Sequence, residues 1–173
     1  MKILLSSILV IFLFFTNQAF SEQKIAFIDL DKVISTSKSG SSILKQLTDL
    51  NNKNLKFLKN EEKKFQEKEV KLINQKNIVS ETDFKNKVNE LKSEIKNYNQ
   101  NRNKMLADFR KLKIDNTNNF LKLINPILVK FSNDKEISII LQKKDLVVAK
   151  TQLEITGEVI KIVNSEVKEF KIK

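Results

Sequence analysis

Apolar side chains recur at alternating intervals of four and three residues through the second half of the central section. Nine of twelve positions with this spacing are apolar, and the set is Phe84, Val88, Leu91, Ile95, Tyr98, Arg102, Met105, Phe109, Leu112, Asn116, Asn119 and Leu123. A sustained 4-3 spacing is typical of a coiled-coil seam rather than of the broader apolar face of a globular helix. The pattern predicts one long helix. The polar members Arg102, Asn116 and Asn119 either loosen the pairing locally, or merely tolerate partial exposure or fix the register.

A second, thinner stripe precedes this one and repeats every seven residues, at Leu44, Asn51, Leu58, Phe65, Leu72 and Val79. Its other row is weak, because Glu62 and Glu69 fall where apolar residues are expected. No Gly or Pro, the residues that interrupt helices, occurs from residue 41 to residue 125. The two stripes predict two antiparallel helices that reverse at residues 75–80, the alternative being one continuous helix with a register slip.

The ends of these helices have recognisable signals. Ser80 is followed by acidic residues and resembles the start of a capping box, so we expect it to begin the second helix. Pro126 is expected to kink that helix, which then resumes. The apolar run 127–131 indicates that this end of the helix enters a core, whereas the reversal does not.

The remaining residues read as strands and one short helix. Short β-like runs occupy 24–30, 137–141 and 146–149, the last two joined by 142–145 as a hairpin, and Thr156 is expected to cap a final helix. The predicted class is α+β, mainly α. Residues 22–42 and 132–173 form a discontinuous body, and residues 43–131 form a helical hairpin inserted into it. The predicted body and oligomer core is Ile25, Phe27, Ile28, Ile139, Leu141, Leu146 and Val148.

This body is small for a stable core. About 60 residues bury too little apolar surface to be comfortably stable alone. Three short strands also leave open sheet edges, which proteins usually cover. Self-association solves both problems, so we expect an oligomer, although these arguments do not give its number.

The first 21 residues have the organisation of a secretory signal peptide. Lys2 supplies a positive charge, residues 3–15 are almost entirely apolar, and Ala19-Phe20-Ser21 provides small residues at the cleavage positions. We therefore expect cleavage before Glu22. An uncleaved anchor is the alternative, but spanning a bilayer takes about 20 apolar residues. Export from the cytoplasm follows from this interpretation.

The composition argues against most enzyme classes. The chain has no Cys, and it has no His, so it lacks a thiol nucleophile, an imidazole base and the usual zinc ligands. Only two Gly residues are present, so no Gly-rich phosphate loop exists. Asp29 and Asp31 share one side of a predicted strand, but such spacing is commonplace. We expect no catalytic site, no metal and no cofactor.

The positive charge lies mainly on the helical hairpin. Residues 41–131 hold 20 Lys and Arg against 11 Asp and Glu, whereas residues 22–40 and 132–173 together hold 11 against 10. The preference for Lys over Arg fits an AT-biased genome, but that bias does not explain an excess confined to one region. Such a surface attracts anionic partners, with anionic lipid head groups as one option. Nucleic acid is not expected, because Arg is scarce and Tyr98 falls on the seam.

With these residues in view, the chain resembles the Skp/OmpH family of periplasmic chaperones. The similarity covers the sequence after the leader and rests on an ordered set of weak motifs: 24–30, Val33-Ile34, Gly40, Pro126-Ile127, Leu146-Val147-Val148 and Glu154-Ile155-Thr156. The last segment resembles a family Asp-Ile-Thr turn with Glu in place of Asp. The family has no catalytic residues to carry over.

The resemblance implies a homotrimer with a barrel-like β body and three hairpins that surround a cavity. It further implies an ATP-independent holdase that keeps unfolded outer-membrane proteins from aggregating. A structural or adaptor coiled coil of the cell envelope is the alternative. On the hairpin, the candidate client-facing residues are Phe57, Lys63, Lys64, Val70, Lys71, Ile73, Ile78, Lys85 and Lys87, although Phe57 and Ile73 also suit packing within the hairpin.

Overall fold

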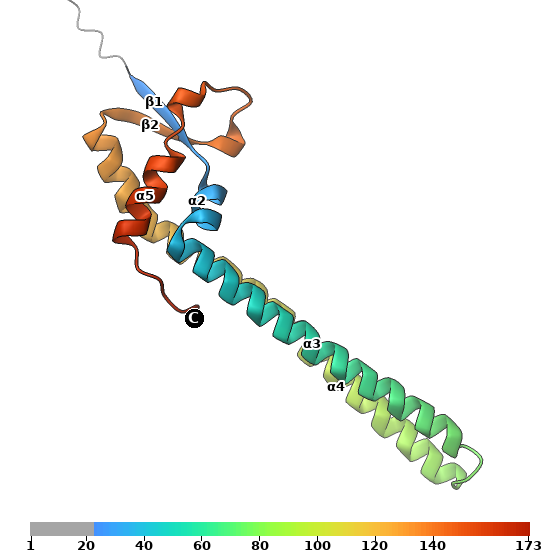
Figure 1. Cartoon of the computed structure of the whole chain (residues 1–173). Helices are drawn as coiled ribbons and strands as arrows, with labels where there is room; N and C mark the ends of the chain where they lie inside the picture. The colour runs from blue at the N-terminus through green and yellow to red at the C-terminus, as the bar shows by residue number, and fades with distance from the viewer. Residues whose placement is uncertain (1–22) are drawn as a thin grey trace, which may run out of the picture.

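A long two-helix arm extends from a small packed body in the computed structural model, which describes residues 23–173 (Figure 1). The elements in chain order are β1 (Lys24–Ile28), α2 (Leu30–Thr36), α3 (Lys38–Gln75), α4 (Glu81–Asp134), β2 (Ile137–Gln142), the 3-10 turns η1 (Lys143–Asp145) and η2 (Thr151–Leu153), and α5 (Thr156–Glu166). The expected mainly helical α+β class is confirmed. The predicted signal peptide and its cleavage site lie outside the described residues.

A tight corner turns the chain from the body into the arm. Ser37 ends α2 and caps α3, where its hydroxyl oxygen accepts a hydrogen bond from the Gly40 N–H at 3.2 Å. A Cβ built on Gly40 would overlap the backbone oxygen of Ile34. Gly40 therefore lies inside the first turn of α3 and allows the two helices to meet closely, rather than marking where a helix stops.

The two long helices run antiparallel and are joined by residues 76–80 (Figure 1). Ser80 caps α4 as expected, because its hydroxyl oxygen accepts from the Asp83 N–H at 3.1 Å and its O–H donates to the Asp83 carboxylate at 2.7 Å. Both helices are thus separately terminated. One continuous helix, the alternative left open by the sequence, does not occur.

Pro126 lies within α4, which continues to Asp134. A proline inside a helix removes one backbone hydrogen bond and crowds the carbonyl four residues earlier, which bends the helix. The last turns of α4, in orange, run at an angle to the arm in Figure 1, in agreement with the expected kink.

The sheet within the described residues has two parallel strands, β1 and β2, rather than three. The predicted strand at 146–149 and its hairpin are wrong. Residues 143–145 form a 3-10 turn closed by a hydrogen bond from the Leu146 N–H to the Lys143 carbonyl, and neither described strand pairs with the segment that follows. The other side of β1 is instead contacted by Glu154 and Ile155, whose N–H donates to the Phe27 carbonyl at 3.0 Å.

The expectation that Thr156 caps the final helix is also wrong. Thr156 is the first residue of α5, and Ile155 occupies the N-cap position without a side-chain cap. The buried Thr156 hydroxyl accepts from the Asp29 N–H at 2.9 Å and donates to Glu154 at 3.0 Å. This hydroxyl links Asp29, near the start of the body, to Glu154, near its end. Because its hydrogen-bonding groups are used in these two bonds, it does not cap α5.

The hydrophobic core lies where the body meets the arm. Its buried members come from β1, α2, both long helices and α5, and they are Ala26, Ile28, Val33, Ile43, Leu47, Phe120, Ile124, Ile127, Phe131, Ile155, Val159 and Val163. We call residues 43–47 and 116–131 the arm root, because they contribute to this core, and residues 48–115 the distal arm. No helix in residues 23–173 is both long and apolar enough to cross a bilayer.

The apolar row of α4 changes register at the arm root. The 4-3 spacing predicted Asn119 and Leu123 at the seam, yet both are exposed, and Phe120 and Ile124 are buried one position later. Stretching the repeat in this way shifts the apolar row around a helix. The reason is a change of neighbours, since the arm root packs on the body elements as well as on α3.

Candidate functional site

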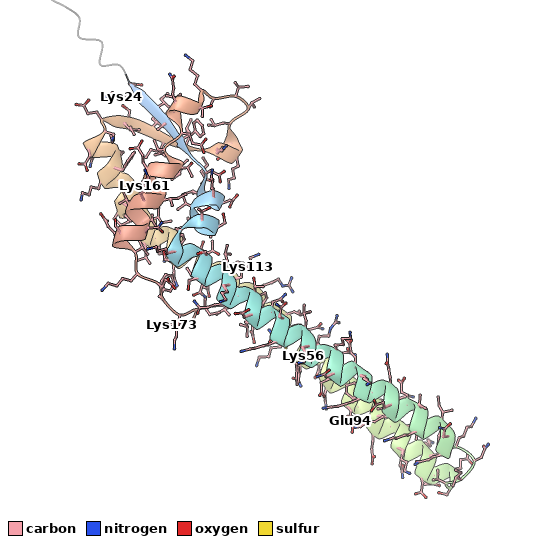
Figure 2. All side chains as sticks on the ribbon, in the orientation of Figure 1. Lys24, Lys56, Glu94, Lys113, Lys161 and Lys173 are labelled. Carbon is pink, nitrogen blue, oxygen red and sulfur yellow. The ribbon has the colours of Figure 1, made fainter. Side chains whose placement is uncertain are left out.

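All nine candidate client-facing residues lie on the outer surface of the distal arm, and each is exposed. Side chains project from α3 and α4 around the arm in Figure 2, where Lys56 and Lys113 are labelled. These residues do not converge on one pocket. The arrangement is a long surface with many separate exposed side chains, which suits weak binding at several places more than recognition of one small ligand.

The four apolar candidates are spread around this surface. Phe57, Val70, Ile73 and Ile78 are 51%, 57%, 68% and 79% exposed, respectively. At about 100° per residue, Phe57 and Ile73 flank the seam of α3 on opposite sides, Val70 points away from α4, and Ile78 lies in the connecting loop. Phe57 and Ile73 therefore keep at least half of their surface exposed beside the seam, which leaves them available for contacts outside the arm.

The five lysine candidates differ in their partners. Lys63 and Lys64 lie near glutamates on α3, at 3.9 Å from Glu67 and 2.7 Å from Glu61. Lys87 donates to the Gln75 side chain at 2.9 Å and so links the two helices near the loop. The ion pairs in residues 23–173 do not include Lys71 or Lys85. Exposed pairs of this kind contribute little to stability, so these lysines remain available to anionic partners.

Shallow hollows follow the groove between the two helices. One of about 230 Å³ lies near the loop and is lined by residues that include Lys71, Leu72 and Leu91. Another of about 400 Å³ lies nearer the body and includes Leu50, Met105 and Phe109 in its lining. Both expose apolar seam residues between polar and charged ones.

Tyr98 fixes the middle of the distal arm. Its ring packs on Phe65 with centroids 5.3 Å apart, and its hydroxyl donates to the Glu62 carboxylate at 2.9 Å. Burial raises the pKa of Tyr98 above its ordinary value, and the hydrogen bond to Glu62 raises it further. Glu62, which weakens the apolar stripe in the sequence, is therefore the partner of a seam tyrosine.

One face of the body sheet is partly uncovered, at Ile25, Ile139 and Leu141, although Phe27 on the same face is buried. Ile25 pairs with Ile139 across the strands, and both are close to half exposed, while Leu141 beside Phe27 is also exposed. The opposite face carries Ala26 and Ile28 into the core. Of the seven predicted core residues, only Phe27 and Ile28 are buried in the single chain. Leu146 is partly exposed, and Val148 lies on the surface beside the fully exposed Val147.

The polar seam residues have different environments. Arg102 and Asn119 are exposed, whereas Asn116 is buried and its side-chain amide bonds to the backbone of Lys173. Gln46 of α3 makes comparable bonds to residues 170 and 172. Sequence reasoning missed this site, and its available signal was the alternation of apolar and charged residues in Phe170-Lys171-Ile172-Lys173. No cluster of three potential metal ligands occurs in residues 23–173.

Comparisons with known proteins agree on one family. The family described as outer membrane protein (OmpH-like) matches residues 24–163. A solved structure from Caulobacter crescentus CB15, described as an OmpH-like outer membrane chaperone, superimposes with a TM-score of 0.71 at 12% identity, over 86% of this chain and 88% of that one. At that identity the likeness concerns the fold. No curated protein sequence gives a significant match.

Proposed function

Because the chain belongs to the OmpH-like family of outer membrane proteins, we propose that it is an ATP-independent periplasmic holdase chaperone for unfolded outer-membrane β-barrel proteins. The observation that carries this proposal is the distal arm, a long basic surface with exposed apolar side chains held on a separately packed body. Newly exported membrane strands alternate apolar and polar residues and aggregate when unprotected. Basic side chains attract acidic segments of such clients, and exposed apolar residues contact their strands.

Weak binding at many points explains retention without an energy source. Each exposed contact is worth little, but several contacts on one surface raise the overall avidity. Release then needs only an acceptor that binds the client better, with no nucleotide and no cofactor. The nine candidate residues on α3, the loop and α4 are the proposed contact points, and the surface charge is a secondary attraction for anionic lipid head groups.

Self-association as a homotrimer is the second part of the proposal. The uncovered sheet face at Ile25, Ile139 and Leu141, and the exposed Val147 and Val148, are the surfaces that support it. An open edge and an apolar face of a short two-stranded sheet are usually covered in a stable protein. Three such bodies in contact would place three arms around a common cavity.

The test is suppression of aggregation by the chain from Glu22 to Lys173. An outer-membrane β-barrel protein is diluted from urea into this protein without nucleotide, and turbidity is followed. We expect suppression near one oligomer of chaperone per client. Unchanged turbidity with a folded, oligomeric protein would contradict the holdase proposal and favour an envelope spacer or adaptor.

The oligomer is tested by sedimentation with a matched pair of substitutions. Ile139→Glu places a charge on the uncovered sheet face and is expected to shift the trimer toward monomer. Ile114→Glu introduces the same charge at an exposed position of the distal arm and should leave the trimer intact. Equal sedimentation of both variants and the parent would exclude the sheet face as the contact between subunits.

The proposed attraction to anionic lipid head groups is tested by binding to lipid vesicles. Vesicle binding that does not change when the charges of the arm are reversed would contradict this part of the proposal.

A further inference from the structure

The last seven residues, Val167–Lys173, run along the arm root after α5 ends at Glu166. We call this segment the tail. Figure 2 shows it leaving the body, with Lys173 close to the start of the arm. The tail lies beyond the residues that match the family, which end at 163.

Two side-chain amides hold the tail by its backbone. The Gln46 side chain donates to the Phe170 carbonyl at 3.0 Å and accepts from the Ile172 N–H at 3.2 Å. The Asn116 side chain donates to the backbone oxygen of Lys173 at 3.1 Å and accepts from the Lys173 N–H at 3.3 Å. Each amide thus pairs with the tail as a residue of a neighbouring β-strand does.

The hydrogen bonds that hold the tail do not depend on which side chains the tail carries. All four hydrogen bonds involve backbone atoms, and any extended peptide presents the same groups. The tail's side chains alternate, since Phe170 and Ile172 pack partly against the core while Lys171 and Lys173 are exposed. This alternation is the pattern of a strand with one apolar face.

The groove has room beside the tail. A hollow of about 460 Å³ lies between the tail and α4, lined by Asn116, Asn119, Lys122, Leu123, Phe170, Lys171 and Lys173. Leu123 is 45% exposed on its wall, and all the charged residues of the lining are lysines. An apolar wall next to positive charge suits an extended segment that carries apolar and acidic side chains.

We propose that the groove between α3 and α4 at the arm root binds extended segments of unfolded clients, and that the tail occupies it in the free protein as a tethered competitor. This inference rests on the proposed chaperone function and adds a specific site and its regulation. The ligand class is an extended peptide with alternating apolar and polar residues, as in a membrane β-strand.

The hydrogen bonds of Asn116 explain how a client segment would replace the tail. Its side-chain oxygen accepts only from the Lys173 N–H among the hydrogen bonds of the described residues. Asn116 is buried with the tail in place and lines the hollow beside it, so water would reach this oxygen once the tail left. A client strand that supplies an N–H at the same place forms the bond that the tail gives up, and so takes its place in the groove.

The tail competes through its tether. With an effective concentration of about 1 mM, a groove that binds the free peptide at about 100 µM is occluded about tenfold. The first experiment therefore compares the chain 22–173 with a chain lacking residues 167–173, and measures anisotropy of a labelled peptide with the sequence Val167–Lys173. We expect about tenfold tighter binding to the shortened chain. Equal or weaker binding by a folded shortened chain would overturn the proposal.

Gln46→Ala in the shortened chain is expected to weaken peptide binding severalfold, because two of the four backbone bonds are lost. Gln66→Ala on the same helix is the matched control, since Gln66 is exposed in the distal arm and should leave binding unchanged. A peptide methylated on the backbone nitrogens of Ile172 and Lys173 lacks both donors and should also bind poorly. Binding that is indifferent to Gln46 and to methylation would reject this groove as the site.

Hydrogen exchange of the unshortened chain keeps the test independent of whether the shortened chain folds. The Ile172 and Lys173 amides should exchange slowly in the free protein and faster when an unfolded β-barrel client is bound. If client binding leaves the exchange of these two amides unchanged, the tail has only a structural role and does not compete with the client. The inference then fails, while the holdase proposal stands. If the unshortened chain does not suppress client aggregation, the proposed function fails regardless of how the peptide behaves.

Discussion

The body and the distal arm are connected by the long helices α3 and α4, but they differ in how many of their side chains are buried. The core at the body and arm root buries side chains from five elements, including Phe120 and Val159 at 0% exposure. In residues 48–115, Leu58 is the one buried residue, and the other seam positions are partly exposed apart from Arg102, which is exposed. The contrast indicates that the body supplies stability, while the arm keeps its surface free for contacts. Regions with few buried apolar contacts open more readily than the core.

The largest expected effect comes from removing a core side chain. Phe120→Ala should lower the free energy of unfolding by about 3–5 kcal/mol, because it deletes a fully buried ring at the arm root. Phe57→Ala, the matched change at an exposed position of the distal arm, should stay within about 0.5 kcal/mol. Urea unfolding followed by circular dichroism measures both. Similar losses of unfolding free energy in the two variants would contradict the conclusion that the body, rather than the arm, supplies the stability.

The two glycines give a second contrast, within the body. Gly40→Ala should destabilise by about 1–3 kcal/mol, because the added Cβ would overlap the Ile34 carbonyl, a backbone atom that cannot easily move. Gly157→Ala, in the first turn of α5, meets no atom within 4 Å and should stabilise by about 0.4–1 kcal/mol. Thermal unfolding of the two variants should therefore shift in opposite directions. A shift in the same direction would show that the corner at Gly40 relaxes.

A smaller effect is expected within the distal arm. Tyr98→Phe removes the hydrogen bond to Glu62 and should reduce local protection by about 0.5–1.5 kcal/mol, seen as faster amide exchange in the arm but not in the body. A double-mutant cycle with Glu62→Ala isolates the pair, and additive effects would mean that the bond contributes nothing.

The same tyrosine predicts a pH dependence. Its pKa is raised above 10.0, by burial first and by the Glu62 hydrogen bond next, so folding favours the neutral phenol. The stabilisation that Tyr98 gives the folded arm is therefore fully present below the pKa of this tyrosine in the unfolded chain. It is lost as the pH rises through the higher pKa of Tyr98 in the folded protein. Amide exchange in the arm at increasing alkaline pH should accelerate more in the parent than in Tyr98→Phe. Identical profiles would contradict this assignment.

The smallest effect per residue concerns charge. Lys71→Glu or Lys85→Glu should each weaken client affinity by about 0.2–1 kcal/mol, and the loss should fade at high salt. Lys144→Glu and Lys161→Glu make the same change at exposed positions of the body and serve as controls. Fluorescence titration with an unfolded β-barrel protein measures all four. Equal losses from arm and body lysines would mean that overall charge, rather than the arm, attracts the client.

The sequence determined the helical hairpin and its chemistry to a large extent. Helical periodicity is a local property, so the spacing from Phe84, the lack of Gly and Pro and the capping signal at Ser80 were sufficient to predict long helices and the start of α4. The exposed lysines of the distal arm were predictable for the same reason, because a single narrow seam leaves most helix positions in solvent.

Only the tertiary structure decided the body. The run 146–149 has strand composition, but a strand needs a partner, and in this chain Glu154 and Ile155 contact β1 instead. Likewise Asn119 and Leu123 fit the seam by spacing, yet packing of the arm root on the body buries Phe120 and Ile124. The pairing of Gln46 and Asn116 with the tail joins residues more than 50 positions apart in the chain. Such contacts depend on where distant segments meet, which local periodicity does not encode.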